Sequence, residues 1–321
     1  MLQVGLIGLG PEWQQRYRPA LQNLRNRLQI RSVFATVSSQ AEVAAADLKC
    51  DPAPGVVGMA ERDDIQAFIV LDSDWHLHVP AWTACRLGKP VFLAGRQATR
   101  FCRPDLRRFS AESGVTLMPG LAHRYTPATS RLRELIATRL GRPQSIEIEA
   151  APESLTSTTD KPGLPVDLQE LLAVAIDWCT CVIGTTPTSI AQAAANGSNG
   201  APTAELRYDL EFRRPQAGGE APRVAVSTVQ PNAAVSHRTY VVPVIRRALV
   251  RCAKGQAILE PPHQITWDVN NARVAEALTS DRPEFEVMLD HFTRRVLGGL
   301  IPVPSLDDLH RAREFAARVA P

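Results

Sequence analysis

The chain has 321 residues and a formal net charge of +3, with 45% hydrophobic and 21% charged residues. This is an ordinary globular composition, and the length predicts two domains rather than a single core. The basic residues, nearly all arginine, form no clustered stripe of the kind that a phosphate-backbone binder needs, so nucleic acid is not an expected partner.

No segment has the form of a membrane or secretion signal. The N-terminal MLQVGLIGLG lacks the charged region of a signal peptide, and the apolar run LLAVAIDWCTCVIG is interrupted by Asp177 and is too short to span a bilayer. The six cysteines are scattered, and the Cys179–Cys181 spacing fits neither a zinc knuckle nor a redox pair. We therefore expect a cytoplasmic protein with reduced cysteines, no metal and no membrane partner.

Short apolar runs alternate with helix-length segments in residues 1–122. The runs are LQVGLIG, RSVFATV, QAFIVL, PVFLA and VTLMPG. Four helices are expected between them: the first begins near Glu12, the second runs through Ala44, the third begins near Trp75 and the fourth near Pro104. Because the runs lack polar–apolar alternation, they are typical of strands buried on both faces of a parallel sheet. This part is predicted to be a doubly wound α/β domain of the Rossmann type.

Residues 123–321 follow a different pattern and predict an α+β domain. A helix around residues 130–138, the strand SIEIEA and a helix from Leu168 to Ile183 come first. The runs that follow alternate apolar and polar residues, which indicates an open, mostly antiparallel sheet; they are ELRYDLEF, RVAVSTV, RTYVVPV, RALVRCA, QAILEP and QITWDV. Two helices, EFEVMLDHFTRRVLGG and SLDDLHRAREFAARV, close the chain.

The clearest motif is VGLIGLGPEW, in which Gly8 and Gly10 lie in a predicted strand-to-helix turn. In a dinucleotide-binding turn a third glycine lets the helix pack closely on the strand. Trp13 stands at that position and either blocks the groove or stacks at its edge. Pro11, at the expected first helical position, removes one N–H donor, and Glu12 repels a phosphate at a helix N-terminus. Two interpretations of the turn therefore remain open: it binds a cofactor, or it is a well-capped helix start that binds no ligand.

Two serines follow the second predicted strand, where an acid would bind the adenine ribose in an NAD site. Ser38 and Ser39 can instead accept a 2′-phosphate, so any bound dinucleotide is expected to be NADP rather than NAD. The alternative is that a serine here is only the N-cap of the next helix.

In order and spacing, four segments resemble the Gfo/Idh/MocA (glucose-fructose oxidoreductase / inositol dehydrogenase / MocA) family over nearly the whole chain. They are VGLIGLGPEW with RPAL, DDIQAFIVLDSDWHLHVPAWTACRLGKPVF, VTLMPGLAHRYTPATSRLRELI, and DHFTRRVLGGLIPVPSLDDLHRAREFA. The resemblance implies a Rossmann domain at residues 1–122 and an open-sheet domain at residues 123–321. It also implies NAD(P)-dependent chemistry on sugars, polyols or related molecules, and homo-oligomers formed through the open sheet.

The chain departs from this family at its catalytic lysine. The family's Glu-Lys-Pro at the end of the fifth strand falls on Ala94, Gly95 and Arg96. The lysine, which the family uses at the reacting oxygen, is therefore replaced by Gly95.

The second departure is the family's Asp-x-x-x-His pair on the helix of the C-terminal domain. Alignment on the trailing Asp177 gives Glu170 at the acid and Val174 at the histidine. Glu170 is a candidate catalytic acid, but with Asp167 it also makes an ordinary helix-capping box. Hydride transfer from an alcohol needs a group that moves the hydroxyl proton, so little dehydrogenase activity is expected.

Other residues are candidates to replace the missing groups. Lys161 lies in the loop before the helix and is either catalytic or an exposed loop lysine. His76 and His78 follow the fourth strand and are candidates for proton transfer, and they lack a third ligand for a metal. The resemblance puts Asp72 and His76 beside a bound dinucleotide, where Asp72 and Asp74 disfavour phosphates.

A second group of side chains would bind the substrate if the resemblance holds. Arg96, His123, Arg124, Tyr125 and Asp177 would then bind a hydroxyl-rich, sugar-like or anionic small molecule. The alternative is that Arg124 and Tyr125 only stabilise the domain junction.

Three functions remain open from the sequence. The first is a binding protein with a degenerate oxidoreductase site. The second is an active NAD(P)-dependent oxidoreductase with relocated acid–base groups. The third is a structural subunit that pairs with a competent relative through the open sheet.

Overall fold

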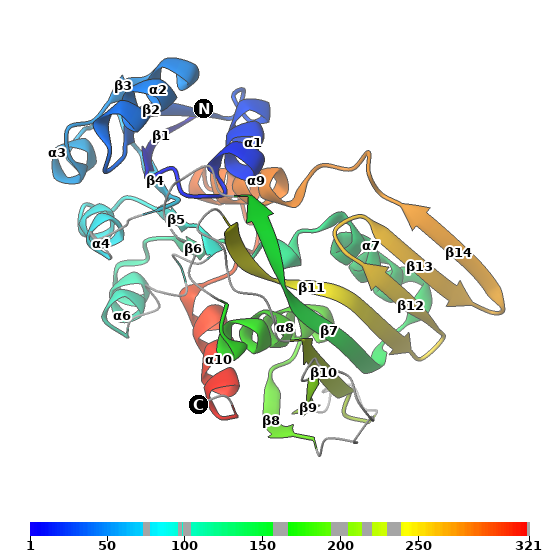
Figure 1. The fold of residues 1–321 in the computed structure, drawn as a ribbon. Helices are drawn as coiled ribbons and strands as arrows, with labels where there is room; N and C mark the ends of the chain where they lie inside the picture. The colour runs from blue at the N-terminus through cyan, green and yellow to red at the C-terminus, as the bar shows by residue number, and fades with distance from the viewer. Residues whose placement is uncertain are drawn as a thin grey trace. The chain divides into compact units, whose positions relative to one another are not determined.

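A computed structural model describes residues 1–72, 78–95, 98, 104–156, 166–193, 205–213, 220–229 and 239–319. The chain divides into two compact units, residues 1–122 with 285–310 and residues 123–284 with 311–321 (Figure 1). The boundary after Ala122 is where the sequence pattern changes. The segment 285–310 differs from the expected division, because it belongs to the first unit.

The first unit contains a six-stranded parallel sheet in the order β3-β2-β1-β4-β5-β6. The chain reverses its direction of winding between β1 and β4, the point at which ligands bind in open α/β sheets. The central strands are buried on both faces, as the unbroken apolar runs predicted. The strands are β1 (Leu2–Ile7), β2 (Leu28–Phe34), β3 (Asp51–Pro52), β4 (Ala67–Val70), β5 (Val91–Leu93) and β6 (Leu117–Pro119).

The helix expected from Glu12 has a different form. A five-residue π-helical turn, Trp13–Tyr17, comes first and is followed by the six-residue α1 (Arg18–Asn23). The other helices that contribute to this unit are α2 (Ser38–Leu48), α3 (Val56–Ala60), α4 (Val79–Arg86), α6 (Pro104–Ser113), α9 (Glu284–Val296) and the start of α10 (Leu306–Ala317).

Aromatic packing explains why α9 returns to the first unit. The ring of Phe285 meets Tyr17 edge-on at a centroid distance of 5.0 Å, and Phe292 lies 5.9 Å from Phe92 of β5. Such pairs add to the burial of large apolar surfaces. An amphipathic helix at the far end of the sequence therefore completes the core of the N-terminal sheet.

The second unit contains an eight-stranded sheet in the order β14-β13-β12-β11-β7-β10-β9-β8. Among the described strands of this sheet, only β10 and β7 pair in parallel, so the mostly antiparallel sheet expected from the alternating runs is confirmed. The strands are β7 (Pro143–Thr156), β8 (Pro187–Gln192), β9 (Glu205–Phe212), β10 (Arg223–Val229), β11 (Thr239–Cys252), β12 (Gly255–Glu260), β13 (Gln264–Val269) and β14 (Ala272–Ala277).

Two helices, α7 (Pro127–Leu135) and α8 (Leu168–Ile183), share one hydrophobic core with this sheet. The helix α8 has the predicted bounds. Its N-terminus is capped by Asp167, whose Oδ1 accepts a 2.6 Å hydrogen bond from the amide of Glu170, and it ends at Gly184 with a positive φ of 81°. Among the described residues, no helix combines the length and apolar character that a bilayer crossing requires.

Candidate functional site

The glycine-rich turn after β1 keeps the backbone geometry of a dinucleotide-binding turn at its first two glycines. Gly8 has a φ of +70°, and a Cβ at this position would lie 1.8 Å from the carbonyl oxygen of Asp72. The Gly8 amide donates a 2.7 Å hydrogen bond to the carbonyl of Phe34. Gly10 also has a positive φ, of +62°. The sharp bend and the close approach of β1 to the end of β4 therefore require these glycines.

The helical part of this turn does not have the form that an anion site needs. The expected helix start at Pro11 was wrong, because the helix begins at Trp13 with Glu12 as its N-cap. Trp13 is 4% exposed, so the indole is packed inside the unit. The Glu12 carboxylate binds the Arg16 guanidinium at 2.8 Å, so its charge is balanced within the turn. A short π turn offers no extended set of aligned amides to a pyrophosphate.

A further carboxylate lies at the same turn. Asp72 follows β4, and its Cβ lies 3.5 Å from the point where a Cβ on Gly10 would stand. The pyrophosphate of a dinucleotide would approach the backbone at the second glycine. The carboxylate of Asp72 opposes a phosphate ligand here by like charge, whereas the charge of Glu12 is balanced by Arg16.

The serines after β2 are not N-caps. Ser38 and Ser39 are the first two residues of α2, and the N-cap is Val37, which provides no side-chain hydrogen bond. Both serines are exposed. Their predicted contact with a 2′-phosphate remains a prediction.

Gly95 lies at the end of β5 in a tight backbone setting. The chain turns into a helical conformation here, with the Ala98 amide donating a 2.8 Å hydrogen bond to the Ala94 carbonyl. A Cβ on Gly95 would lie 3.1 Å from the carbonyl oxygen of Gly120, which is closer than ordinary van der Waals contact. A residue with a Cβ at this position would therefore require the Gly120 carbonyl to shift by a few tenths of an ångström.

In the second unit, three of the expected substrate-binding residues form one polar cluster. The His123 Nε2 lies 2.6 Å from Oδ2 of Asp177 on α8. Arg124 donates from Nε to the same oxygen at 2.7 Å and from Nη2 to Oδ1 at 2.5 Å. Both carboxylate oxygens are thus engaged, and the Asp177 side chain is only 2% exposed.

The electrostatics of this cluster favour the ionised carboxylate. Burial by itself raises the pKa of Asp177, but the hydrogen bonds from Arg124 and His123 outweigh it and lower the pKa to about 2. Tyr125, next in the chain, is 8% exposed, and burial raises the pKa of its phenol. Arg124 therefore stabilises the C-terminal unit itself, through Asp177.

Hydrogen bonds around α7 fix the backbone of this cluster. The Thr129 hydroxyl donates to the carbonyl of His123 at 3.1 Å and accepts a 2.9 Å hydrogen bond from the indole of Trp178. Thr126 caps α7 and donates to the same Thr129 oxygen at 2.8 Å. Asp177 and Trp178 are consecutive on α8, so the helix and the His123 turn hold one another in place.

The other candidates are not brought into this cluster. Val174 packs against the hydrophobic core of the second unit, and Glu170 lies in the first turn of α8. His78 is the half-buried residue before α4 and makes no side-chain cap hydrogen bond. The predictions for Asp74, His76, Arg96 and Lys161 fall outside the described residues.

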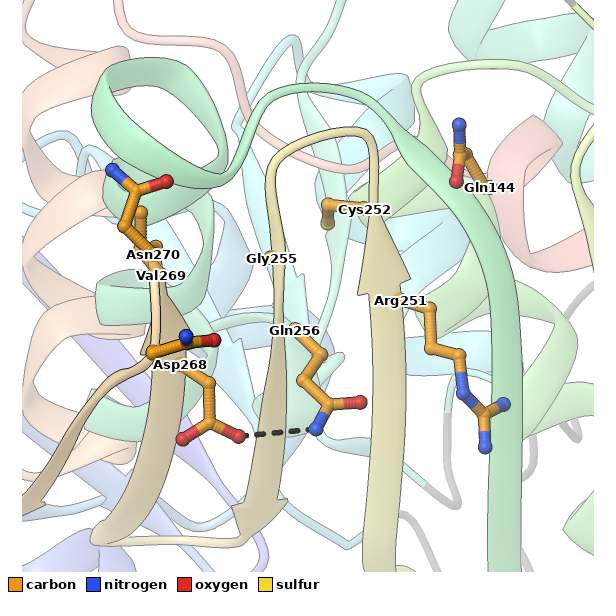
Figure 2. Close-up of a pocket in the computed structure, with 9 residues that line it drawn as sticks. Gln144, Arg251, Cys252, Gly255, Gln256, Asp268, Val269 and Asn270 are labelled. Atoms are coloured by element: carbon orange, nitrogen blue, oxygen red, sulfur yellow. Dashed lines mark hydrogen bonds between the residues drawn. The ribbon is translucent and has the colours of Figure 1, made fainter.

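The second unit also contains a hollow of about 530 Å³ at one end of the sheet (Figure 2). Gln256 of β12 donates a 3.0 Å hydrogen bond to Asp268 of β13, and the two side chains point toward one another. Asn270 and Asn271 have positive φ values of 51° and 65°, which the two-residue hairpin turn after β13 requires. Turn geometry and strand pairing account for these polar residues, so we assign the hollow no ligand.

No family model matches the sequence, and no curated protein matches it. Solved structures match over nearly the whole chain. A dehydrogenase from Chromobacterium violaceum has a TM-score of 0.76 at 14% identity, covering 99% of this chain and 94% of its own. The dehydrogenase MviM from Clostridium difficile has a TM-score of 0.72 at 14% identity, covering 99% and 98%.

A UDP-N-acetylglucosamine 3-dehydrogenase from Acidithiobacillus ferrooxidans has a TM-score of 0.70 at 17% identity, covering 99% of this chain and 96% of its own. The chain has the fold of these dehydrogenases. The resemblance to the Gfo/Idh/MocA family is thereby confirmed for the fold.

Proposed function

We propose that the chain is a small-molecule-binding protein with the Gfo/Idh/MocA dehydrogenase fold and a degenerate active site, with little dehydrogenase activity. The observation that carries the proposal is the loss of both proton-moving side chains, since Gly95 and Val174 stand where the family has lysine and histidine. The local structure supports it, because Gly95 faces a backbone carbonyl and Val174 packs in the core.

The expected size of the defect is large. Loss of one general acid–base group costs about 10²- to 10⁴-fold in rate, or roughly 3 to 5 kcal/mol of activation free energy. Two such groups are missing at the family positions. Dehydrogenase turnover by the usual route should therefore not be distinguishable from the rate of nicotinamide reduction without protein.

A nicotinamide dinucleotide fits the first unit poorly. The conformations of Gly8 and Gly10 suit it, but the short π-helical turn offers few aligned amides and the carboxylate of Asp72 opposes its pyrophosphate. Weak binding, with NADP preferred over NAD through Ser38 and Ser39, is the most that these residues support. We therefore assign no reaction step to the cofactor.

An active oxidoreductase with relocated acid–base groups is the second candidate. His123 favours it, because a histidine paired with a buried carboxylate is a recurring arrangement in proton transfer. Lys161 and His78 are the other candidates for this role, and Glu170 is the candidate acid.

We also propose that the protein forms a homo-oligomer through the open face of the C-terminal sheet. Side chains of both charge signs line this face, including Glu147, Glu149, Arg207 and Arg247 around a hollow of about 160 Å³. A face that carries both signs can be complementary to a second copy of itself. Pairing with a catalytically competent relative would use the same surface.

The function is tested by combining turnover and binding measurements. The purified protein is mixed with UDP-N-acetylglucosamine and NAD⁺ or NADP⁺, and reduced nicotinamide is followed by absorbance. A thermal-shift series with neutral sugars, polyols and sugar acids is run in parallel. We expect a ligand-dependent rise in Tm without reduction of nicotinamide. Reduction above the no-protein control would contradict the proposal.

A further inference from the structure

We propose that His123 is a proton-transfer residue of the C-terminal unit, with Asp177 as the positioning residue that fixes its tautomer. This goes beyond the proposed function, because it concerns acid–base chemistry in a unit that does not carry the dinucleotide turn. The group it would serve is a hydroxyl of a bound small molecule.

The geometry assigns different tasks to the two ring nitrogens. Nε2 of His123 lies 2.6 Å from a carboxylate oxygen that is buried and ionised, so this nitrogen carries the proton and donates it. Among the described residues, Nδ1 has no hydrogen-bond partner, and the side chain is 14% exposed. The lone pair of Nδ1 is then available to a ligand as a base.

The charge of the Asp177 carboxylate is balanced by another side chain of the cluster. Arg124 already places a full positive charge on Asp177 through two hydrogen bonds. The carboxylate therefore needs no charge from His123, and the pair of Arg124 and Asp177 is neutral overall. Arg133 and, on α8, Cys181 also act electrostatically on Tyr125, the residue next to Arg124.

The arrangement is more rigid than a surface histidine. The His123 carbonyl is held by Thr129, and the Asp177 carboxylate is held by Arg124, so neither partner can rotate without breaking hydrogen bonds. Pre-set orientation is what an acid–base group needs, because proton transfer requires a fixed donor–acceptor geometry. His123 thus lies on a turn that is hydrogen-bonded to α8 through Asp177.

The proposed step is a reversible proton transfer. The O–H bond of the ligand breaks, its electron pair stays on the oxygen, and the proton bonds to the Nδ1 lone pair. The imidazolium that forms keeps its Nε2–H bond to Asp177, whose negative charge stabilises it. The reverse step returns the proton from Nδ1 to the oxygen.

The tautomer can be read without any ligand or nucleotide, so this test is independent of the proposed function. The full chain is labelled with ¹⁵N-histidine, the ring nitrogens are recorded by long-range ¹H–¹⁵N correlation, and His123 is assigned by its absence from His123→Gln. We expect a slowly exchanging, hydrogen-bonded Nε2 proton and an unprotonated Nδ1. A protonated Nδ1, or rapid mixing of both tautomers, would overturn the proposal.

Two variants extend the test to positioning and reactivity. Asp177→Asn should raise the population of the second tautomer, and unchanged tautomers in a folded variant would refute the role of Asp177.

Hydrolysis of p-nitrophenyl acetate reports accessible basic imidazole, so His123→Gln should lower the rate of hydrolysis. The matched control is His263→Gln, since Nδ1 of His263 is buried. Equal rates for the two variants would refute the role of His123.

Discussion

The ion pair between Arg124 and Asp177 gives the sharpest prediction of stability. Arg124→Gln removes both charge-assisted hydrogen bonds from a carboxylate that is 2% exposed. Within the described part of the chain, the hydrogen bond from His123 is then the one that remains. Removing one partner of a buried ion pair costs about 3 to 5 kcal/mol, because the other charge is left uncompensated. We expect a loss of that size in the free energy of unfolding at pH 7.

The pH dependence follows from the pKa of Asp177. Its folded value of about 2 lies below the usual value of about 3.9. This depressed pKa contributes about 2 to 3 kcal/mol of stability above pH 4, and the contribution is lost as the pH falls from about 4 to about 2. In Arg124→Gln burial dominates and raises the pKa of Asp177. The free energy of unfolding of this variant therefore falls less when the pH is lowered. The difference between the two proteins should therefore shrink at low pH.

Urea unfolding at pH 7 and pH 3, followed by tryptophan fluorescence, measures both effects. Trp178 lies beside Asp177 and is fully buried, so it reports unfolding of this unit. Arg251→Gln is the matched control, because Arg251 and Glu147 are 2.6 Å apart but 46% and 52% exposed. The loss in the free energy of unfolding of Arg251→Gln should be below about 1 kcal/mol. Equal losses in both variants, or a difference that does not depend on pH, would refute the reasoning.

Two further predictions concern the turn and the sheet edge. Gly8→Ala should lower stability by more than about 2 kcal/mol in calorimetric unfolding, because its Cβ would stand 1.8 Å from a backbone oxygen. Gly88→Ala, which has a similar φ of +71° but open space, should cost only about 1 to 2 kcal/mol. Glu276→Gln should cost about 1 to 2 kcal/mol and shift the fluorescence of Trp267, since Glu276 accepts hydrogen bonds from Trp267 and Arg131. An unshifted emission maximum would contradict this.

The elements with strong local signals were predictable. The bounds of α8 follow from Asp167 at its N-cap and Gly184 after its last residue. The strand β11 was expected as two strands but is one, because a bulge at Arg246 interrupts the pairing without ending it. The edge strands β8 and β14 were missed, since β14 is almost wholly exposed and lacks an apolar alternation.

The site was predictable only in its residue types. The sequence identified His123, Arg124 and Asp177 as candidates. Their assembly around one carboxylate depends on two contacts between distant parts of the sequence: His123 is separated from Asp177 by 54 positions and Arg124 by 53. The π turn at Trp13 was also not predictable, because it is a local adjustment of a helix whose sequence gives no signal for it. The neighbourhood of Asp72 and Gly10 likewise depends on the pairing of β1 with β4.

Calorimetric titration with NAD⁺, NADH, NADP⁺ and NADPH tests the central claim most directly. The claim is that the dinucleotide turn no longer supports tight binding of a nicotinamide cofactor. We expect no nucleotide to bind with a Kd below about 1 mM, which corresponds to about 4 kcal/mol of binding free energy. A micromolar Kd for any of the four would contradict the account and restore the dehydrogenase as the favoured function.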